Sequence, residues 1–209
     1  MIVAGVDEAG RGPIAGPVVA AAAVLTPPQF RVLLSEGLND SKKLSASRRE
    51  RLFARMKELG VVWAAQAATN VRIDNTNILA ATLWAMGRAV KRIDLPLDLV
   101  VVDGSSYIPD IPHALQRVMP RADARVPSVM AASVTAKVLR DRVMLALHRL
   151  FPEYGFDKHK GYPTSFHRRM VDMLGPSRVH RLSFASCKHI KMEIPWEEGS
   201  RKAALFDDD

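Results

Sequence analysis

The chain has 209 residues, of which 48 % are hydrophobic and 25 % charged, an ordinary composition for a globular protein of one domain or at most two small ones. Its 30 Lys and Arg outnumber its 22 Asp and Glu, and the resulting charge of +8 favours a polyanionic partner. The single cysteine, Cys187, excludes an internal disulfide framework and is typical of a reducing compartment. Prolines interrupt the uncharged segment 12–26, which follows acidic residues, so we expect a soluble cytoplasmic protein without a signal peptide.

Two apolar segments open the chain, at 1–7 and 17–25, and neither alternates with polar residues. Because strands that are buried on both faces read as continuous apolar runs, these segments predict two neighbouring strands. The stretch between them is rich in glycine and proline and predicts turns. A polar loop is expected over 37–50. A helix should begin there with a capping box at Ser47 and end at Gly60.

The rest of the chain continues with strands and helices in alternation. Segments 61–69 and 98–104 predict two further strands, and 77–93 and 131–151 predict long helices. A polar, aromatic loop follows, then a short helix over 168–175. This order predicts an α/β domain with a mixed sheet. The side chains expected on the buried faces of the three longer helices are Leu52, Phe53, Met56, Leu59, Ile78, Leu79, Leu83, Met86, Val90, Ala132, Ala136, Leu139, Val143, Leu147 and Leu150.

Carboxylates stand where two of the predicted strands end: Asp7 with Glu8, and Asp103. Ligands of open α/β sheets bind at the ends of strands, so we expect these acids to converge. Neighbours in a strand point to opposite faces, so Asp7 and Glu8 can share a site only where the strand bends or ends. Asp123, just ahead of the last long helix, is the candidate fourth acid. An ordinary turn after the strand and a surface loop are the alternatives for Asp103 and Asp123.

Such a cluster has to bind protons or cations, because two unit charges about 4 Å apart repel by roughly 4 kcal/mol at an effective dielectric of 20. Oxygen ligands suit Mg²⁺ or Mn²⁺, and the chain has no HExxH or CxxC that would indicate zinc. Asp141 is a rival acid, but Lys137 four residues before it favours an ion pair. The segment 10–16 lacks the GxGxxG spacing of dinucleotide sites. A metal site on a basic chain therefore points to phosphodiester chemistry.

Five segments are more specific than this chemistry: GVDEAGRGPIAGPVVAAAAVL, LNDSKKLS, VVDG, VPSVMAASVTAKVLRDR and YGFDKHKGYPTSFH, in that order. Together they closely resemble the type 2 ribonucleases H, the ribonuclease HII family, over residues 2–188. The resemblance implies a ribonuclease H-like fold, with a mixed five-stranded sheet flanked by helices and a helical C-terminal extension. We expect a catalytic domain over 1–190 and a flexible tail over 191–209.

The family carries four acids in the order Asp, Glu, Asp, Asp, and these match Asp7, Glu8, Asp103 and Asp123. The resemblance implies that these residues are catalytic and hold Mn²⁺ or Mg²⁺. Positions 121–123 read Arg-Ala-Asp where the family commonly has Lys-Gly-Asp, so the geometry of that loop is expected to differ.

The same resemblance implies how substrate is recognised. The family's Gly-Arg-Gly segment, which matches Gly10, Arg11 and Gly12, reads the ribose 2′-hydroxyl, the group that separates RNA from DNA. Tyr162 matches a tyrosine that stacks beside the RNA–DNA junction. Leu182 stands where a second arginine is usual, so one phosphate contact should be missing. The residues expected near phosphates, with a solvated surface as the alternative for the basic ones, are Lys42, Lys43, Ser133, Lys137, Arg140, His159 and Lys160.

The resemblance implies an endoribonuclease that cuts on the 5′ side of a ribonucleotide in an RNA–DNA hybrid or embedded in duplex DNA, leaving a 3′-hydroxyl and a 5′-phosphate. It would serve ribonucleotide excision and the removal of RNA primers. The rival classes are a non-catalytic hybrid-binding module and a resolvase or exonuclease of the same fold. We expect a monomer. Leu205 and Phe206 loosely match short clamp-binding peptides, with plain disorder of the tail as the favoured alternative.

Overall fold

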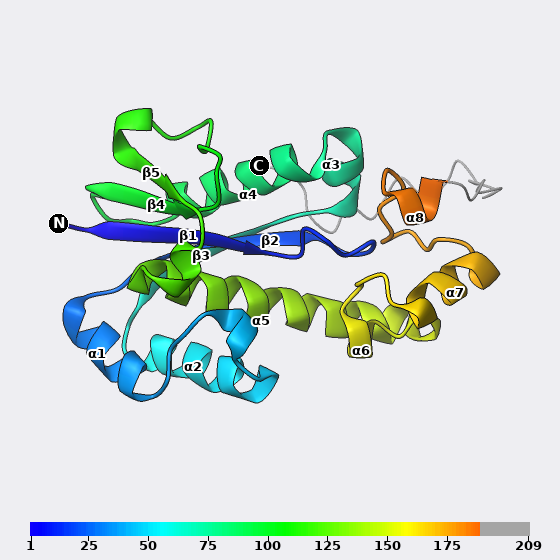
Figure 1. Ribbon diagram of the computed structural model, residues 1–209, viewed down its shortest axis with the longest axis horizontal. Helices are drawn as coiled ribbons and strands as arrows, with labels where there is room; N and C mark the ends of the chain where they lie inside the picture. The colour runs from blue at the N-terminus through cyan, green and yellow to red at the C-terminus, as the bar shows by residue number, and fades with distance from the viewer. Residues whose placement is uncertain (189–209) are drawn as a thin grey trace.

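The computed structural model describes residues 1–188 and contains a mixed five-stranded sheet in the order β3-β2-β1-β4-β5 (Figure 1). β2 pairs with β1 and β3 antiparallel, whereas β4 pairs with β1 and β5 parallel. The mixed sheet confirms the expected fold class. The strands are β1 (Val3–Ala9), β2 (Val18–Val24), β3 (Val62–Ala68), β4 (Leu99–Asp103) and β5 (Gln116–Met119). The apolar pattern missed β5 because this short edge strand begins with Gln116 and Arg117.

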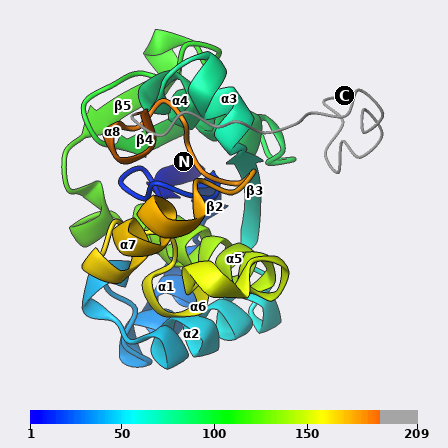
Figure 2. The ribbon, with the colours of Figure 1, turned by 90° about the vertical axis from the view of Figure 1, so that its right-hand side faces the viewer.

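Helices cover both faces of the sheet (Figures 1 and 2). α4 (Ile78–Lys91) packs on one face and α5 (Pro127–Leu150) on the other, and α2 (Ala46–Glu58) packs against α5. At one end of the sheet gather α6 (Phe156–His159), α7 (Ser165–Leu174) and α8 (Ala185–Lys188), which form the expected C-terminal extension. The remaining helices are α1 (Pro27–Ser35) and α3 (Asn70–Asn75). No helix within residues 1–188 is long and apolar enough to cross a membrane.

The alternation of side chains along β1 separates two cores. Ala4 and Val6 belong to the core shared with α4. Gly5 points the other way and lies so close to α5 that a Cβ atom there would stand 2.1 Å from the backbone nitrogen of Val129. Because side chains two residues apart share a face, Asp7 also points toward α5.

This close approach makes Gly5 a sensitive position. We expect Gly5→Ala to lower the free energy of unfolding by about 3 kcal/mol, because neither the strand nor the helix backbone can move without breaking its own hydrogen bonds. Chemical denaturation measures the change. Gly60→Ala is the control: a Cβ at Gly60 meets nothing within 4 Å, so only its φ of +66° opposes the methyl group, at about 1 kcal/mol. Equal losses in the two variants would contradict this interpretation.

The start of α2 differs from expectation, and α1 is a helix that the sequence did not predict. α2 begins at Ala46, because the Ser45 side chain accepts a hydrogen bond from the Arg48 backbone nitrogen, and Ser47 lies inside the helix. A capping box instead starts α1, where Thr26 and Gln29 bond each other's backbone. The two prolines after Thr26 are compatible with a first helical turn, which has no use for their missing N–H groups.

α5 begins at Pro127, four residues before the expected start. The predicted buried stripes are also too long. Leu150, in the last turn of α5, is 62 % exposed, and Leu79, in the first turn of α4, is 41 % exposed. Both residues continue a helical period past the end of the surface that the helix covers, which a periodic pattern alone does not reveal.

Candidate active site

Three aspartates meet at adjoining strand ends. The parallel register of β1 and β4 ends with the pair Val6 and Val102, so Asp7 and Asp103 are the next residues on neighbouring strands. Asp123 joins them from the short 3-10 helix Ala122–Ala124 just before α5. Each of the three carboxylates offers an oxygen within 4.8 Å of the others. The convergence expected from the sequence is therefore present for these three acids.

Asp103 also shapes the loop that carries Asp123. Its Oδ1 accepts a hydrogen bond of 2.7 Å from the Ala122 backbone nitrogen, which ties the loop to the end of β4. Arg121 takes the left-handed conformation, with φ of 60°. Ala122 is fully buried against the sheet beside Val129. The Arg-Ala-Asp sequence at 121–123 thus still delivers its acid to the cluster.

Burial and mutual repulsion act together on these carboxylates. Asp7 is 4 % exposed, and burial, then the charges of Glu8 and Asp103, raises its pKa well above the usual range. Burial, followed by the charge of Asp123, also raises the pKa of Asp103. A cluster of this kind favours the uptake of protons or cations. One cation comes from the chain, since Lys42 Nζ lies 3.0 Å from Asp123 Oδ2.

The donor set fits a hard divalent cation. Carboxylate oxygens are the ligands that Mg²⁺ and Mn²⁺ prefer. In the part of the chain that the structure describes, Asp7, Asp103 and Asp123 are the one group of three acidic, histidine or cysteine side chains with ligand atoms this close together. No sulfur or imidazole belongs to the group, so its chemistry differs from that of a zinc site.

Glu8 lies at the edge of the cluster. β1 continues through it to Ala9, and Glu8 pairs with Ala20 of β2, so its side chain leaves the sheet on the face opposite to Asp7. Its carboxylate lies 3.7 Å from Arg11 Nη1. Burial raises the pKa of Glu8, against the attraction of Arg11 and with the repulsion of Asp103. Glu8 thus acts on the cluster through its charge.

Ser133 lies behind Asp7. It is 2 % exposed, its side chain acts to lower the pKa of Asp7, and its hydroxyl forms a hydrogen bond of 2.8 Å with the Ser41 hydroxyl. Because α5 begins at Pro127, Ser133 stands in its second turn, not at the helix N-terminus where the sequence suggested a phosphate contact. We correct that expectation: in this structure Ser133 supports Asp7.

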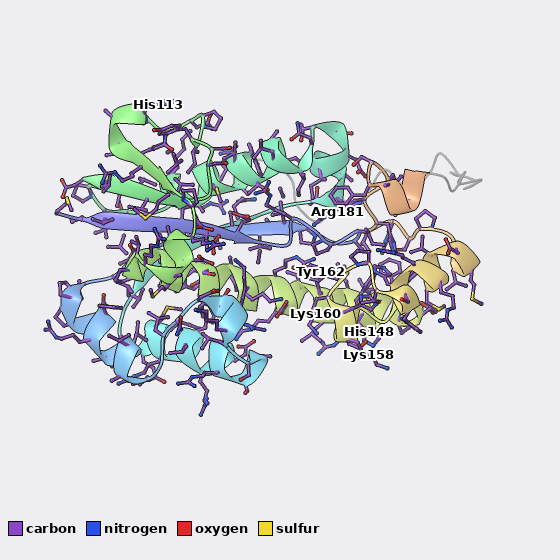
Figure 3. The ribbon with its side chains drawn as sticks, viewed as in Figure 1. His113, His148, Lys158, Lys160, Tyr162 and Arg181 are labelled. Atoms are coloured by element: carbon purple, nitrogen blue, oxygen red, sulfur yellow. The ribbon has the colours of Figure 1, made fainter. Side chains whose placement is uncertain are left out.

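The glycine segment, residues 10–17, follows directly from β1. Gly10 has φ of +102°, which a residue with a Cβ rarely adopts. A Cβ atom at Gly12 would lie 3.6 Å from Cε1 of Tyr162, whose ring is 45 % exposed. Tyr162, labelled in Figure 3, comes from the loop between α6 and α7, so the fold brings together the two motifs to which the family resemblance assigned substrate recognition.

Arg140 is the largest correction among the expected phosphate contacts. It is completely buried, and it donates hydrogen bonds to the carbonyls of Pro17 at 3.1 Å and Ala15 at 3.4 Å. A Cβ at Gly10 would lie 1.9 Å from its Nε. Arg140 therefore supports the glycine segment from within and offers no surface to a phosphate.

Three of the other basic candidates, Lys137, His159 and Lys160, have partners within the protein. Lys137 pairs with Asp141 at 2.7 Å, as the helical spacing predicted, and Asp141 stays outside the carboxylate cluster. Lys160 donates to the Asp157 carbonyl. Both ring nitrogens of His159 bond the backbone of its own loop and the residue is partly buried, so neither nitrogen is free for a phosphate in this structure. Lys43 is exposed, next to Lys42.

Arg181 is a residue that the sequence did not reveal. It is completely buried at the end of the sheet near Tyr162 (Figure 3) and donates to four carbonyls of the glycine segment. A lone arginine in an irregular segment carries no periodic signal. Its neighbour Leu182, where the family resemblance implied an arginine, donates its backbone N–H to Asp74 at 3.0 Å.

Two buried histidines, also missed, connect this region. Ser177 donates its backbone N–H to His180 Nδ1 at 2.9 Å, so the proton of a neutral His180 is on Nε2. That Nε2 lies 3.0 Å from His167 Nε2, which must accept. His167 Nδ1 then donates to the Tyr162 carbonyl at 2.9 Å. This chain of hydrogen bonds through the neutral rings of His180 and His167, called the histidine relay below, fixes the backbone carbonyl of Tyr162.

The relay predicts a pH dependence of stability. Burial lowers the pKa of His167 to about 4, with a further contribution from His159, and burial followed by repulsion from His167 lowers the pKa of His180 to about 3. An unfolded histidine titrates near about 6.5. The unfolded chain binds more protons in this interval, so the stabilisation is complete above about pH 6.5 and is lost as the pH falls toward these values. We expect urea denaturation to show stability falling between about pH 7 and pH 5, with a smaller fall in His180→Gln. An unchanged slope in the variant would contradict the assignment.

A mixed sheet with three carboxylates at adjoining strand ends defines a class of protein, the ribonuclease H-like hydrolases that act on phosphodiesters with divalent metal. The family model for ribonuclease HII matches residues 4–187. The chain belongs to the ribonuclease HII family and is thus a ribonuclease H, an endonuclease. The resemblance that the sequence motifs indicated is confirmed.

Relatives and solved structures agree. The chain is 47 % identical over 189 residues to the ribonuclease HII of Rhizobium leguminosarum, covering 90 % of this chain and 80 % of the relative. It is 48 % identical over 182 residues to that of Syntrophotalea carbinolica, covering 87 % and 84 %. The crystal structure of ribonuclease H2 from Pyrococcus horikoshii superposes with a TM-score of 0.74 at 28 % identity, covering 90 % of this chain and 96 % of the other. The Mn²⁺ complex of Bst ribonuclease HIII shares the fold, with a TM-score of 0.76 at 20 % identity, covering 90 % and 68 %.

Proposed function

We propose that this ribonuclease H cleaves the phosphodiester on the 5′ side of a ribonucleotide, in an RNA–DNA hybrid or at a lone ribonucleotide in duplex DNA. The observation that supports this most strongly is that the Gly12 backbone and the Tyr162 ring meet beside the end of the strand that carries Asp7. Gly12 and Tyr162 would then contact the RNA–DNA junction of the same substrate whose phosphodiester lies at the carboxylate cluster. Removal of RNA primers and excision of single ribonucleotides are the corresponding cellular roles.

The reaction is hydrolysis. Water adds to phosphorus, the bond from phosphorus to the 3′ oxygen of the preceding nucleotide breaks, and a 3′-hydroxyl and a 5′-phosphate result. Bound Mn²⁺ or Mg²⁺ would neutralise the charge that develops on the attacking and leaving oxygens. Asp7, Asp103 and Asp123 would hold that metal, with Glu8 contributing negative charge beside them.

Lys42 pairs with Asp123 and could release it when a metal ion neutralises that carboxylate. Burial opposes its charge, but its bond to Asp123 and the charge of Asp7 outweigh burial and raise its pKa, so it stays protonated at neutral pH. Its side chain is 77 % exposed, which leaves it able to turn from Asp123 to a substrate phosphate. Lys42 would thus exchange the Asp123 carboxylate for a phosphate of the substrate.

The deciding experiment offers a DNA duplex that contains one ribonucleotide and maps the cut with end labels. We expect cleavage at the 5′ side of the ribonucleotide, with ends that a polymerase extends and a ligase accepts. An all-DNA duplex and a four-way junction should stay intact. Cleavage on the 3′ side, or of the junction, would disprove the proposal and favour a resolvase-like activity of the same fold.

Tyr162 gives a prediction specific to lone ribonucleotides. Stacking of a base on an aromatic ring contributes about 1–3 kcal/mol, so Tyr162→Ala should reduce kcat/KM at a lone ribonucleotide by about 5-fold to 150-fold. Tyr162→Phe should retain most activity, because the ring remains. The ratio of rates on the lone ribonucleotide and on a long hybrid measures the effect. Equal losses on both substrates would contradict a role in junction recognition.

A contact with a sliding clamp is a separate proposal. The ribonuclease HII of Archaeoglobus fulgidus, 25 % identical with a TM-score of 0.72, has been solved as a complex with PCNA. In this chain the matching residues would be Leu205 and Phe206, which lie outside the described residues. A pull-down with a sliding clamp, using the full chain and a chain without residues 200–209, tests it, and equal binding by both would disprove it. The chain is proposed to act as a monomer in the cytoplasm.

A further inference from the structure

Two buried arginines, Arg181 and Arg140, form hydrogen bonds with the glycine segment from the interior of the protein. Seven of its eight carbonyl oxygens accept hydrogen bonds from Arg181 or Arg140. The Arg181 side chain donates to Gly10 at 2.7 Å, Arg11 at 2.9 Å, Pro13 at 2.7 Å and Gly16 at 2.9 Å, its backbone nitrogen donates to Ile14 at 2.9 Å, and Arg140 donates to Ala15 and Pro17.

These bonds determine which way the amides of the segment point. In a trans peptide the C=O of one residue and the N–H of the next lie in one plane and point in opposite directions, and the described chain has no cis peptide. Because the Gly10 and Arg11 carbonyls are drawn inward by Arg181, the N–H groups of Arg11 and Gly12 point outward. Both residues are exposed. Among residues 1–188 neither of these two N–H groups has a hydrogen-bond acceptor.

The two guanidinium groups are unusual for a second reason. Arg181 and Arg140 are completely buried, and neither forms an ion pair with a carboxylate of the described residues. Burial, together with the charge of Arg140, lowers the pKa of Arg181 to about 9, still above neutral pH. Four carbonyl oxygens accept hydrogen bonds from Arg181, the centre of the Phe184 ring lies 5.1 Å from its Cζ, and the charge of Asp74 also favours its charged form. A buried positive charge beneath the segment favours an electron-rich group above it.

We propose that Arg181 is a positioning residue for ribose selection, which turns the free N–H groups of Arg11 and Gly12 outward to donate to the 2′-oxygen of the ribonucleotide. Arg140 supports the far end of the same segment. The inference rests on the proposed function for its substrate, but the arrangement of the segment does not depend on substrate. Two measurements therefore separate the two claims.

The first measurement uses the wild-type protein without substrate. By ¹⁵N NMR we expect the Arg11 and Gly12 amides to exchange with solvent rapidly, since they are not bonded, while their order parameters stay near the rigid value of about 0.85. Amides of Ile14 and Gly16, which donate to Gly161 and Val179, serve as protected controls in the same segment. Order parameters below about 0.6, or protected Arg11 and Gly12 amides, would overturn the proposal even if the enzyme cleaves as expected.

The second measurement compares Arg181→Lys with Arg178→Lys. Lysine keeps the buried charge but lacks the planar fork that spans four carbonyls. Arg178 lies in the same segment with its side chain exposed, and it donates no hydrogen bond to the glycine segment, so its variant should behave as wild type.

For Arg181→Lys we expect kcat/KM on the lone ribonucleotide to fall at least tenfold, exchange of the Ile14 and Gly16 amides to accelerate, and affinity for an all-DNA duplex to change less than twofold. Wild-type selectivity with an unchanged segment would refute the positioning role. A variant that loses its fold would shift all amides of the protein, and the wild-type NMR result then decides alone. If the wild type fails to cleave but its segment is rigid and unprotected, the proposed substrate is wrong and the segment geometry stands.

Discussion

Asp103→Asn is expected to lower kcat for cleavage at a single ribonucleotide by roughly 10³-fold or more, while the Kd for the uncleaved duplex changes little. Asp103 joins β4, the loop before α5 and the carboxylate cluster, since its Oδ1 accepts a hydrogen bond from the Ala122 N–H and its carboxylate has an oxygen within 4.8 Å of Asp7 and Asp123. Asparagine keeps an acceptor for the Ala122 N–H but removes the negative charge. The backbone should therefore stay in place while the affinity for metal is lost.

Although Asp103→Asn should lose activity, we do not expect it to lose stability. Without metal, the charge of Asp103 is opposed first by burial and then by Asp123, so removing it should leave the melting temperature in chelator unchanged or higher. Asp98→Asn is the matched control, because Asp98 precedes the same strand and its carboxylate bonds Ile2 at the far end of the sheet. A near-normal rate for Asp103→Asn would mean that another acid carries the chemistry.

Removal of divalent metal should abolish cleavage, and added Mg²⁺ or Mn²⁺ should restore it. The three aspartates lie together and two of them are almost fully buried, so they cannot all stay charged and productive without a cation. An excess of chelator, followed by titration with each metal, gives the test on the ribonucleotide duplex. Zn²⁺ is the informative comparison, since the oxygen-only ligand set suits it poorly. Cleavage that survives chelation would exclude metal-assisted hydrolysis.

The positions of the acids were predictable because they follow from short apolar strands. Val6 and Val102 each precede an aspartate, and parallel pairing of their strands makes those aspartates neighbours. Asp123 was less predictable from pattern alone, since its place depends on a left-handed Arg121 and on the bond from Ala122 to Asp103. Glu8 lies outside the group of three whose carboxylate oxygens are close together, but its charge raises the pKa of Asp7, and its role at the metal stays a prediction.

The interior support of the site was not predictable. Arg140 reads as an exposed basic residue on a helix, and Arg181 reads as a surface arginine in a loop, because both belong to a residue type that is rarely buried. Only the folded chain shows that several carbonyl oxygens of the glycine segment point inward and accept hydrogen bonds from these two arginines. The histidine relay has the same origin, since His167 and His180 are thirteen positions apart and meet through tertiary contacts alone.

Direct binding of Mn²⁺, followed by electron paramagnetic resonance of the free ion, tests the central claim without any assay of cleavage. The carboxylate cluster predicts that the wild-type protein takes up Mn²⁺, that Asp7→Asn weakens the affinity at least tenfold, and that Asp98→Asn leaves it unchanged. Equal Mn²⁺ affinity in the wild type and Asp7→Asn would contradict the account, because the buried aspartate at the end of β1 would then not be a metal ligand.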